Sequence, residues 1–304
     1  MQEIIVTTNE SGQRFDKLLS KFLNEAPKSF IYKMLRKKNI VLNGKKATGN
    51  EKLETGDVIQ LYLSDDTIEK FSSVNIKRTN QKIDIIYEDE HVMLINKPVG
   101  MLSQKADASD ESLVEHVISY MLQSNQLSEN DLRKFKPSVC NRLDRNTSGL
   151  VVAGKSLLGL QTMGELFKNR TMKKFYRCLV IGEVTEKQHI CGYLKKDTNS
   201  NFVTVMDDEI SGSIPIETEY EPIWTNGRCT LLEVHLITGR THQIRVHMKY
   251  IGHPLPGDFL YNPDYSVIQR QALHSHRLVF VHPITNQKME FTSPLPEDMN
   301  SILK

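Results

Sequence analysis

The stretch that decides the fold and chemistry of this chain is residues 141–155, which read NRLDRNTSGLVVAGK. It places the carboxylate of Asp144 between two arginines and opens onto the apolar segment Leu150-Val151-Val152-Ala153. An opposite charge nearby lowers a carboxylate pKa, so we expect Arg142 and Arg145 to keep Asp144 ionised. The same arginines suit a polyanionic ligand. Taken alone, Asp-x-x-Thr-Ser-Gly is also ordinary turn chemistry, because such side chains satisfy nearby backbone groups.

Further motifs follow this stretch in a fixed order. They are KKFYRCLVIG at 173–182, TGRTHQIRVH at 238–247, GHPLPGD at 252–258, and Leu273-His274. With 141–155 they resemble the RluA-type pseudouridine synthases, whose motifs are H-R-L-D-x-x-T-S-G, K-x-Y-x-A-x-V-x-G and G-R-T-H-Q-I-R-x-H. The resemblance covers about residues 83–296. Strands interspersed with a few helices predict an α+β domain with a mixed, largely antiparallel sheet, and the resemblance implies that this sheet carries the active-site cleft.

The resemblance also implies roles for particular residues. Asp144 would either attack C1′ of the target uridine or remove a proton from C2′, and the sequence leaves both routes open. Tyr176 would stack on the base, and Arg245 would pair with Asp144. Leu273 would form an apolar wall of the base pocket. Arg142 would fill the place left by the flipped nucleotide or bind an adjacent phosphate.

Neither a metal nor a cofactor is expected. The isomerisation loses no atom and involves no redox change. The histidines of the last third of the chain lack a zinc-binding spacing, and the four cysteines form no C-x-x-C pair. We expect His242 and His247 to support Arg245 by hydrogen bonding instead. Without the motif, Arg245 would be interpreted as a surface arginine on a strand.

The first 63 residues have a different charge balance. They contain 11 Lys/Arg and 7 Asp/Glu, a net of +4, whereas the remainder contains 28 and 30, a net of −2. Apolar spacing predicts one helix through Phe15 and Phe22 and a second helix near 30–38, with Ser29 as its N-cap. An Asn-Gly turn at Asn43 and an alternating strand at 58–63 follow. The segment resembles an S4 RNA-binding domain.

That second resemblance implies RNA phosphates across the second helix and the Asn-Gly turn. The expected RNA contacts are Arg14, Lys17, Lys33, Arg36, Lys37 and Asn43. Such contacts set affinity and register rather than sequence choice. Residues 64–82 are polar and weakly patterned, which predicts a linker. The expected organisation is therefore an S4-like domain at 1–63, a linker at 64–82 and a pseudouridine synthase domain at 83–304.

Within the larger domain the pattern predicts several elements. Strands are expected at Ile85-Ile86-Tyr87, at Val92-Met93-Leu94-Ile95, and at 174–182, 215–224 and 229–237, the last two joined at Asn226-Gly227. Helices are expected at 111–123 and 157–168.

We predict a pseudouridine synthase that acts on structured RNA, with large-subunit (23S) ribosomal RNA as the target, because the N-terminal module adds an anchoring surface. The alternatives are a transfer RNA target and a non-catalytic RNA-binding assembly factor. A glycosidase would need a second carboxylate beside Asp144. No apolar run is long enough for a membrane span, the start lacks signal-peptide features, and the cysteine usage suits a reducing cytoplasm. A monomer is expected.

Overall fold

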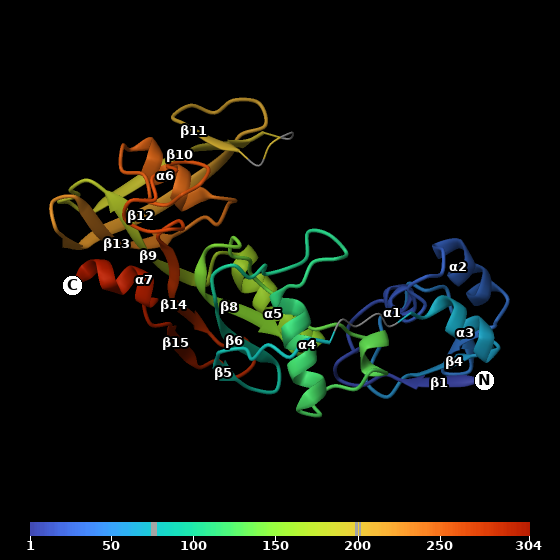
Figure 1. The fold of residues 1–304 in the computed structure, drawn as a ribbon. Helices are drawn as coiled ribbons and strands as arrows, with labels where there is room; N and C mark the ends of the chain where they lie inside the picture. The colour runs from blue at the N-terminus through green and yellow to red at the C-terminus, as the bar shows by residue number, and fades with distance from the viewer. Residues whose placement is uncertain (74–77, 198–199, 201) are drawn as a thin grey trace.

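The computed structural model describes residues 1–73, 78–197, 200 and 202–304 and divides them between two β-sheets (Figure 1). We call residues 1–73 the N-terminal unit and residues 78–304 the C-terminal unit. The N-terminal unit contains β1 (Gln2–Ile5), α1 (Phe15–Phe22), α2 (Lys28–Arg36), β2 (Ile40–Leu42), β3 (Lys45–Lys46), β4 (Val58–Leu61) and α3 (Asp65–Phe71). Its four strands pair antiparallel in the order β1-β4-β2-β3.

The local sequence explains most of the N-terminal unit. The apolar face of α1 is buried as predicted, and the turn between β2 and β3 has positive φ at Asn43 and Gly44, 51° and 69°. Asn and Gly tolerate this conformation, which is why the Asn-Gly pair predicted the turn. The second helix begins earlier than expected: α2 starts at Lys28, and its N-cap is Pro27 rather than Ser29.

The predicted linker is wrong over residues 65–71, which form helix α3. Ser64 caps this helix by accepting a hydrogen bond from the backbone N–H of Thr67. Ile68 is buried in the core of the N-terminal unit, and the ring of Phe71 lies 4.6 Å from that of Phe30. The helix was not predicted because its two apolar residues are separated and flanked by five polar ones. Since Ile68 and Phe71 pack in the N-terminal core, the unit extends beyond residue 63. Part of the predicted linker, residues 74–77, lies outside the described residues.

The C-terminal unit is built on one long sheet. Its strand order is β11-β10-β12-β13-β9-β14-β8-β6-β5, with β15 added to β14 and β7 added to β8. The strands are β5 (Ile85–Glu88), β6 (Val92–Lys97), β7 (Ser138–Val139), β8 (Ser148–Gly154), β9 (Lys173–Ile181), β10 (Gln188–Lys196), β11 (Val203–Met206), β12 (Ile214–Thr225), β13 (Cys229–Leu236), β14 (Leu273–Val281) and β15 (Lys288–Thr292). Among the described strands only β14 and β8 pair in parallel. The predicted α+β class with a mixed, largely antiparallel sheet is confirmed.

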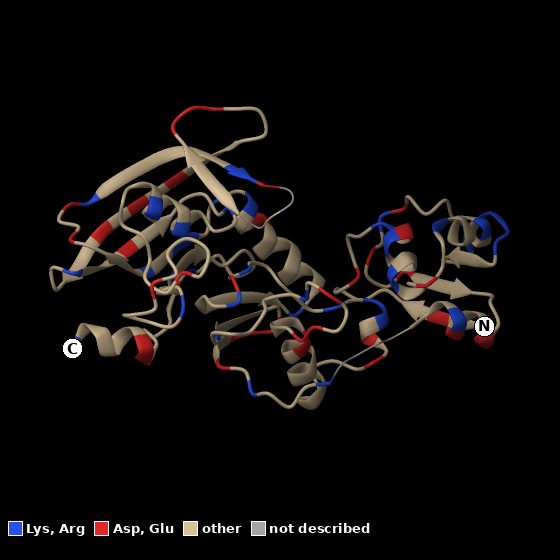
Figure 2. Cartoon of the chain, turned by 45° about the horizontal axis from the view of Figure 1, so that its top comes forward, with Lys and Arg blue, Asp and Glu red and all other residues tan. Residues whose placement is uncertain are grey.

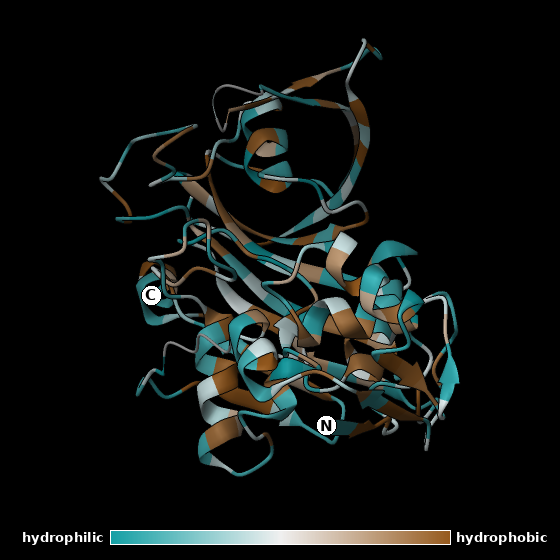
Figure 3. Cartoon of the chain, turned by 90° about the vertical axis from the view of Figure 1, so that its right-hand side faces the viewer, coloured by the Kyte–Doolittle hydropathy of each residue, from teal (hydrophilic) through white to brown (hydrophobic). Residues whose placement is uncertain are grey.

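Helices and short 3-10 turns complete the unit. They are α4 (Leu113–Gln123), η1 (Asp131–Arg133), α5 (Leu157–Lys168), α6 (Gln243–Tyr250), α7 (Glu297–Asn300) and η2 (Ser301–Leu303). In Figure 3 the apolar colour falls mainly on helices and strands, while the loops are mostly hydrophilic. None of the helices in the described ranges combines the length and apolar character that crossing a bilayer requires.

The predicted helices and strands agree with the structure to within two or three residues at their ends. In the C-terminal unit the prediction did not include β7, β8, β10, β11, β14, β15, α6 and α7. Strand β10 is QHICGYLKK, in which charged and polar residues dilute the alternation on which strand prediction depends.

One glycine of the opening motif is required by the sheet. Gly149 lies in β8 at φ 109°, next to Ser275 of the parallel strand β14. A Cβ atom on Gly149 would lie 2.2 Å from the carbonyl oxygen of Ser275. Any other residue would push the two strands apart. Because the loop 141–147 enters the sheet at this point, Gly149 also fixes where Asp144 lies.

Candidate active site

A cleft of about 1070 Å³ lies between the loop that carries Asp144, strands β9 and β14, and helix α6. The residues predicted for the site that line it are Arg142, Asp144, Tyr176, Arg245 and Leu273. They come from widely separated parts of the sequence, and the structure brings them to one place. The volume is at the upper end of that of ligand pockets, which suits a single flipped nucleotide with part of its strand.

Arg245 is the most buried of the predicted site residues. It lies on helix α6 with 1% of its side chain exposed, so the interpretation as a surface arginine on a strand is wrong. Its Nε and Nη2 donate to the two oxygens of Asp258 at 2.6 and 2.7 Å, and its Nη1 donates to Oδ2 of Asp144 at 2.7 Å. Burial alone lowers the pKa of Arg245, but the hydrogen bonds and charges of the two carboxylates raise it overall. Arg245 therefore remains a fixed cation.

Asp144 faces the cleft with about a third of its side chain, 32%, exposed. Its cationic partner is Arg245, whereas Arg142 and Arg145 are exposed and make no ion pair with it among the described residues. The ion pair with Asp144 is therefore made by a residue distant in sequence and not by the two flanking arginines. Oδ2 of Asp144 is engaged by Arg245, and in the described part of the chain Oδ1 accepts no hydrogen bond. One oxygen is thus held and the other faces the cleft.

Tyr176 and Leu273 form part of an apolar wall of the cleft. Tyr176 lies on β9 and is 7% exposed, and Leu273, the first residue of β14, is 5% exposed. Burial raises the pKa of Tyr176 to about 12, helped by the charge of Asp144 and opposed by a hydrogen bond with Ser275. The phenol is therefore neutral at physiological pH. A neutral ring beside an aliphatic wall suits stacking of a planar base.

Asp258 is a site residue that the sequence did not predict. The Gly257-Asp258 pair was noted only as a segment of the resemblance. Asp258 is completely buried and fixes Arg245 through two hydrogen bonds. Gly257, at φ 70°, has no room for a Cβ, which would lie 2.3 Å from the carbonyl oxygen of Arg270. The compact Gly-Asp turn was the signal that could have identified this carboxylate.

Lys97 was also missed. It is fully buried at the end of β6, and its Nζ donates to the carbonyls of Pro98, Met101 and Arg145 at 2.9, 2.9 and 3.2 Å. Burial lowers its pKa to about 7, and the charge of Asp144 acts in the opposite direction. Through these three hydrogen bonds Lys97 holds the backbone next to Asp144 in place. A single lysine at a strand end gives no sequence signal for such a role.

The two histidines do not support Arg245 as expected. Nδ1 of His242 lies 3.0 Å from the hydroxyl of Tyr261, and its Nε2 lies 3.9 Å from Oδ2 of Asp144. Nδ1 of His247 lies 2.9 Å from the hydroxyl of Thr218. Arg245 is paired with the carboxylates of Asp144 and Asp258 instead. These stabilise a buried cation by their charge as well as by hydrogen bonding.

The residues predicted to contact RNA in the N-terminal unit fall into two groups. Lys17, Lys33, Arg36 and Lys37 are exposed, and Figure 2 shows basic residues gathered along α2 and the turn after it. The side chains of Arg14 and Asn43 instead make hydrogen bonds to other residues of the N-terminal unit. Arg14 donates to both oxygens of Asp16 at 3.0 and 2.9 Å, and Asn43 bridges Asp57 and the backbone of Val58. These two side chains hold the unit together.

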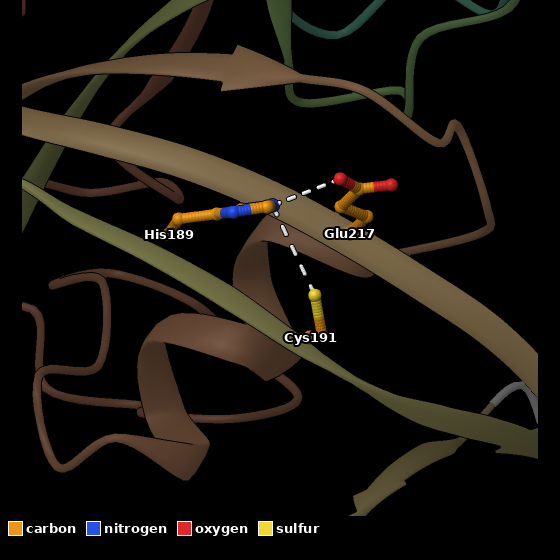
Figure 4. Close-up of side chains that lie close together, drawn as sticks. All are labelled: His189, Cys191 and Glu217. Carbon is orange, nitrogen blue, oxygen red and sulfur yellow. Dashed lines mark hydrogen bonds and ion pairs between the residues drawn. The ribbon is translucent and has the colours of Figure 1, made fainter.

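The described residues contain one cluster with metal-binding donors, formed by His189, Cys191 and Glu217 (Figure 4). It is not part of the cleft. Thr218 faces helix α6, where it contacts His247, so its strand neighbour Glu217 points to the opposite face of the sheet. The other carboxylate near Asp144 is Asp258, which is buried against Arg245. It cannot act as the exposed second acid that a glycosidase requires.

Comparison with known proteins agrees with this geometry. Residues 91–250 match the model of the RNA pseudouridylate synthase family. The chain belongs to this family. It is 30% identical over 312 residues to the uncharacterized RNA pseudouridine synthase YlyB of Bacillus subtilis (strain 168), covering 100% of this chain and 98% of the relative. As a pseudouridine synthase, the protein isomerises uridine to pseudouridine in RNA.

Other relatives and solved structures extend the comparison. Ribosomal large subunit pseudouridine synthase C of Vibrio vulnificus (strain CMCP6) is 30% identical over 317 residues, with 100% of this chain and 96% of the relative covered. The solved structure of human RNA pseudouridylate synthase domain containing 1 is similar with a TM-score of 0.57 at 19% identity, over 73% of this chain and 87% of that one. At this identity the likeness supports the pseudouridine synthase fold, in agreement with the sheet described above.

Proposed function

We propose that this pseudouridine synthase modifies uridines in large-subunit (23S) ribosomal RNA. Two kinds of observation support this target. Several relatives that match along their whole length are named ribosomal large subunit pseudouridine synthases, including synthase D of Blochmanniella floridana at 30% identity. In addition, the N-terminal unit presents exposed basic side chains that suit the backbone of a large folded RNA.

Asp144 is the catalytic carboxylate in this proposal, and its placement is the observation that carries the chemistry. One oxygen is held by a buried arginine, and the other faces the cleft. The free oxygen either attacks C1′ as the N1–C1′ bond breaks, or removes the C2′ proton to give a glycal. After the uracil turns, C5 bonds to C1′, the C5 proton leaves and N1 is protonated. In the first route the bond between Asp144 and C1′ breaks as C5 attacks. In the second route the proton taken from C2′ returns to C2′, so both routes regenerate the carboxylate.

Arg245 and Asp258 position that carboxylate. Arg245 stays charged because Asp258 satisfies two of its nitrogens, so the third nitrogen remains directed at Asp144. Holding a reacting group in one orientation removes an entropic part of the barrier. Tyr176 stacks on the uracil as a neutral phenol, with Leu273 as the neighbouring wall. Arg142, exposed at the edge of the cleft, binds the phosphate beside the flipped nucleotide or fills its place.

The N-terminal unit acts as an S4-like RNA anchor in this proposal. Lys33, Arg36 and Lys37 are exposed and make no ion pair within the described ranges, so their charge is available to phosphates. Arg14 and Asn43 serve the unit structurally, as their hydrogen bonds indicate. The protein works as a monomer.

The test is position-specific mapping of pseudouridine in total RNA from cells with and without this protein. Sites that disappear from large-subunit ribosomal RNA, and return with the wild type but not with Asp144→Asn, are the expected result. If sites are lost only from transfer RNA, then transfer RNA, and not large-subunit ribosomal RNA, is the target. If no site disappears from ribosomal RNA, the proposed large-subunit target is overturned.

A further inference from the structure

We propose that Arg170, Lys174 and Arg240 form a clamp for one backbone phosphate of the substrate, at the end of the cleft beyond Tyr176. All three line the same cleft as Asp144. The inference rests on the proposed function, since it names the part of the RNA strand that this end of the cleft holds.

Lys174 is the residue that requires a ligand. It lies on β9, two residues before Tyr176, so both side chains point to the same face, about 7 Å apart along the strand. Only 8% of Lys174 is exposed, yet within the described residues its ammonium makes neither a hydrogen bond nor an ion pair. Its Nζ is not among the fully buried side-chain atoms that lack a partner, so the ammonium reaches the open cleft. A largely buried cation that faces a cleft without a protein partner suits an anionic group of the substrate.

The surroundings of Lys174 make the need for an anion stronger. Burial lowers the pKa of Lys174 to about 8, and the nearest charges that act on it are two further cations, Arg170 and Arg240. In the part of the chain that the structure describes, neither arginine makes an ion pair with a carboxylate. Arg170 also lines a smaller pocket that contains Glu217 and Asp207, but no ion pair joins it to either residue in the described ranges. Three cations that no described carboxylate neutralises match the oxygens of a phosphodiester.

The backbone leaves room for this arrangement. Gly239 precedes Arg240, and a Cβ atom at Gly239 would lie 3.2 Å from Nζ of Lys174, so a side chain there would crowd the ammonium. The backbone N–H of Arg240 donates to Oε1 of Gln243 at 3.1 Å, which fixes the loop at the start of α6. The loop that carries Arg240 is therefore held in place, and the position next to Lys174 stays open.

The clamp is tested with Lys174→Met, which removes the charge and keeps most of the side-chain stem. The matched control is Lys173→Met, an exposed neighbour whose side chain points to the other face of the sheet. Binding to an in vitro transcript of large-subunit ribosomal RNA is measured over a series of salt concentrations, together with thermal unfolding. We expect Lys174→Met to weaken binding about tenfold and to lower the salt slope by about one, with no change for Lys173→Met.

Thermal unfolding separates a clamp from a structural role. Removing an unpaired buried charge should leave the melting temperature unchanged or higher. If Lys174 is structural, Lys174→Met lowers the melting temperature and leaves the salt slope as in the wild type, and the clamp is overturned. This measurement needs no turnover and no knowledge of the modified site. A failure of the clamp is thus distinguishable from a failure of the proposed target, which the mapping experiment decides.

A different observation, on the opposite face of the sheet, carries a second proposal. We infer that His189, Cys191 and Glu217 bind one zinc-like divalent cation. His189 and Cys191 are two apart on β10 and share a face, and the strand register places Glu217 of β12 directly opposite Cys191. Figure 4 shows the three side chains converging. The sequence spacing could not predict this site, because one of its donors comes from another strand.

The distances between the donor atoms suit a tetrahedral cation. Nε2 of His189 lies 2.9 Å from Oε1 of Glu217 and 3.8 Å from Sγ of Cys191, and all three donors lie within 4.8 Å of one another. Zinc bonds of about 2.0 to 2.3 Å bring such ligand atoms to roughly 3 to 4 Å apart. At His189 and Cys191 strand β10 is paired with β12, which holds these two donors in place, and the exposed face admits the ion.

The metal site is tested by titrating the purified protein with Co²⁺, which absorbs in the near ultraviolet when a thiolate binds it. We expect one bound ion per chain, loss of the thiolate band in Cys191→Ser, and at least about tenfold weaker binding in His189→Ala. Cys140→Ser, which changes a partly buried cysteine elsewhere, is the control and should retain the band. An unchanged band in Cys191→Ser, or no binding of Co²⁺ or Zn²⁺ by the wild type, would overturn the metal site. The three side chains would then form only a hydrogen-bonded cluster.

Discussion

The N-terminal unit and the cleft of the C-terminal unit both depend on arginine and lysine, but they place these residues in opposite environments. Along α2, Lys33, Arg36 and Lys37 are exposed and make no ion pair with any described residue. In the cleft, Arg245 is 1% exposed and hydrogen-bonded to two carboxylates. Exposed cations provide affinity that salt screens, whereas a buried, paired cation provides geometry that salt barely affects. In the proposed function the first region anchors RNA, whereas the second orients one carboxylate.

The largest effect is expected from Asp144→Asn in the cleft. The change removes the reacting charge and alters little volume, so turnover should fall by at least about a thousandfold while RNA affinity changes by less than about tenfold. Single-turnover assays and filter binding on one RNA measure both quantities. Equal losses of binding and activity would show that Asp144 belongs to the anchoring function, and the contrast between the two regions would fail.

Asp258→Asn should have the next largest effect, because it acts on Arg245 and not on the substrate. Arg245 would lose its charged partner and its fixed orientation, which we expect to lower kcat by about a hundredfold. The buried cation left with a single carboxylate should also reduce the free energy of unfolding by about 3 kcal/mol. Kinetics and denaturant unfolding are the measurements, with the exposed Asp208→Asn as the control. An unchanged kcat would remove Asp258 from the site.

Charge reversal in the N-terminal unit should change affinity but not the chemical step. For the combined change of Lys33, Arg36 and Lys37 to Glu, the slope of log affinity against log salt should fall by about three. KM for RNA rises and kcat at saturating RNA stays the same. The matched control reverses Lys187, Lys288 and Lys304, which are exposed in the C-terminal unit. If kcat falls as well, the N-terminal unit also takes part in forming the active site.

The smallest effect on turnover is expected from Ile68→Ala, which tests the boundary between the regions. Ile68 is buried in a core whose members all lie in the N-terminal unit, so its truncation should destabilise that unit by about 2 to 3 kcal/mol. Hydrogen exchange should report faster opening of α1 and α2 and unchanged protection of β9 and β13. Faster exchange in both units would mean that they unfold together.

The sequence alone predicted what depends on short stretches of chain. Apolar spacing predicted α1, α5 and the long strands, and Asn-Gly pairs predicted two turns, because these features depend on neighbours a few residues apart. Motifs in a fixed order predicted the fold class and the family. They also identified Asp144, Tyr176 and Arg245 as a group that the structure brings to one cleft.

Only the tertiary structure decided which charges meet. The arginines adjacent to Asp144 in sequence do not pair with it, while Arg245, from a distant helix, does. Asp258 fixes Arg245, Lys97 holds the loop in place, and Lys174 makes no ion pair or hydrogen bond through its ammonium with the residues that the structure describes. Electrostatic contacts depend on distance in space and on burial, and neither quantity can be read from the spacing of residues along the chain.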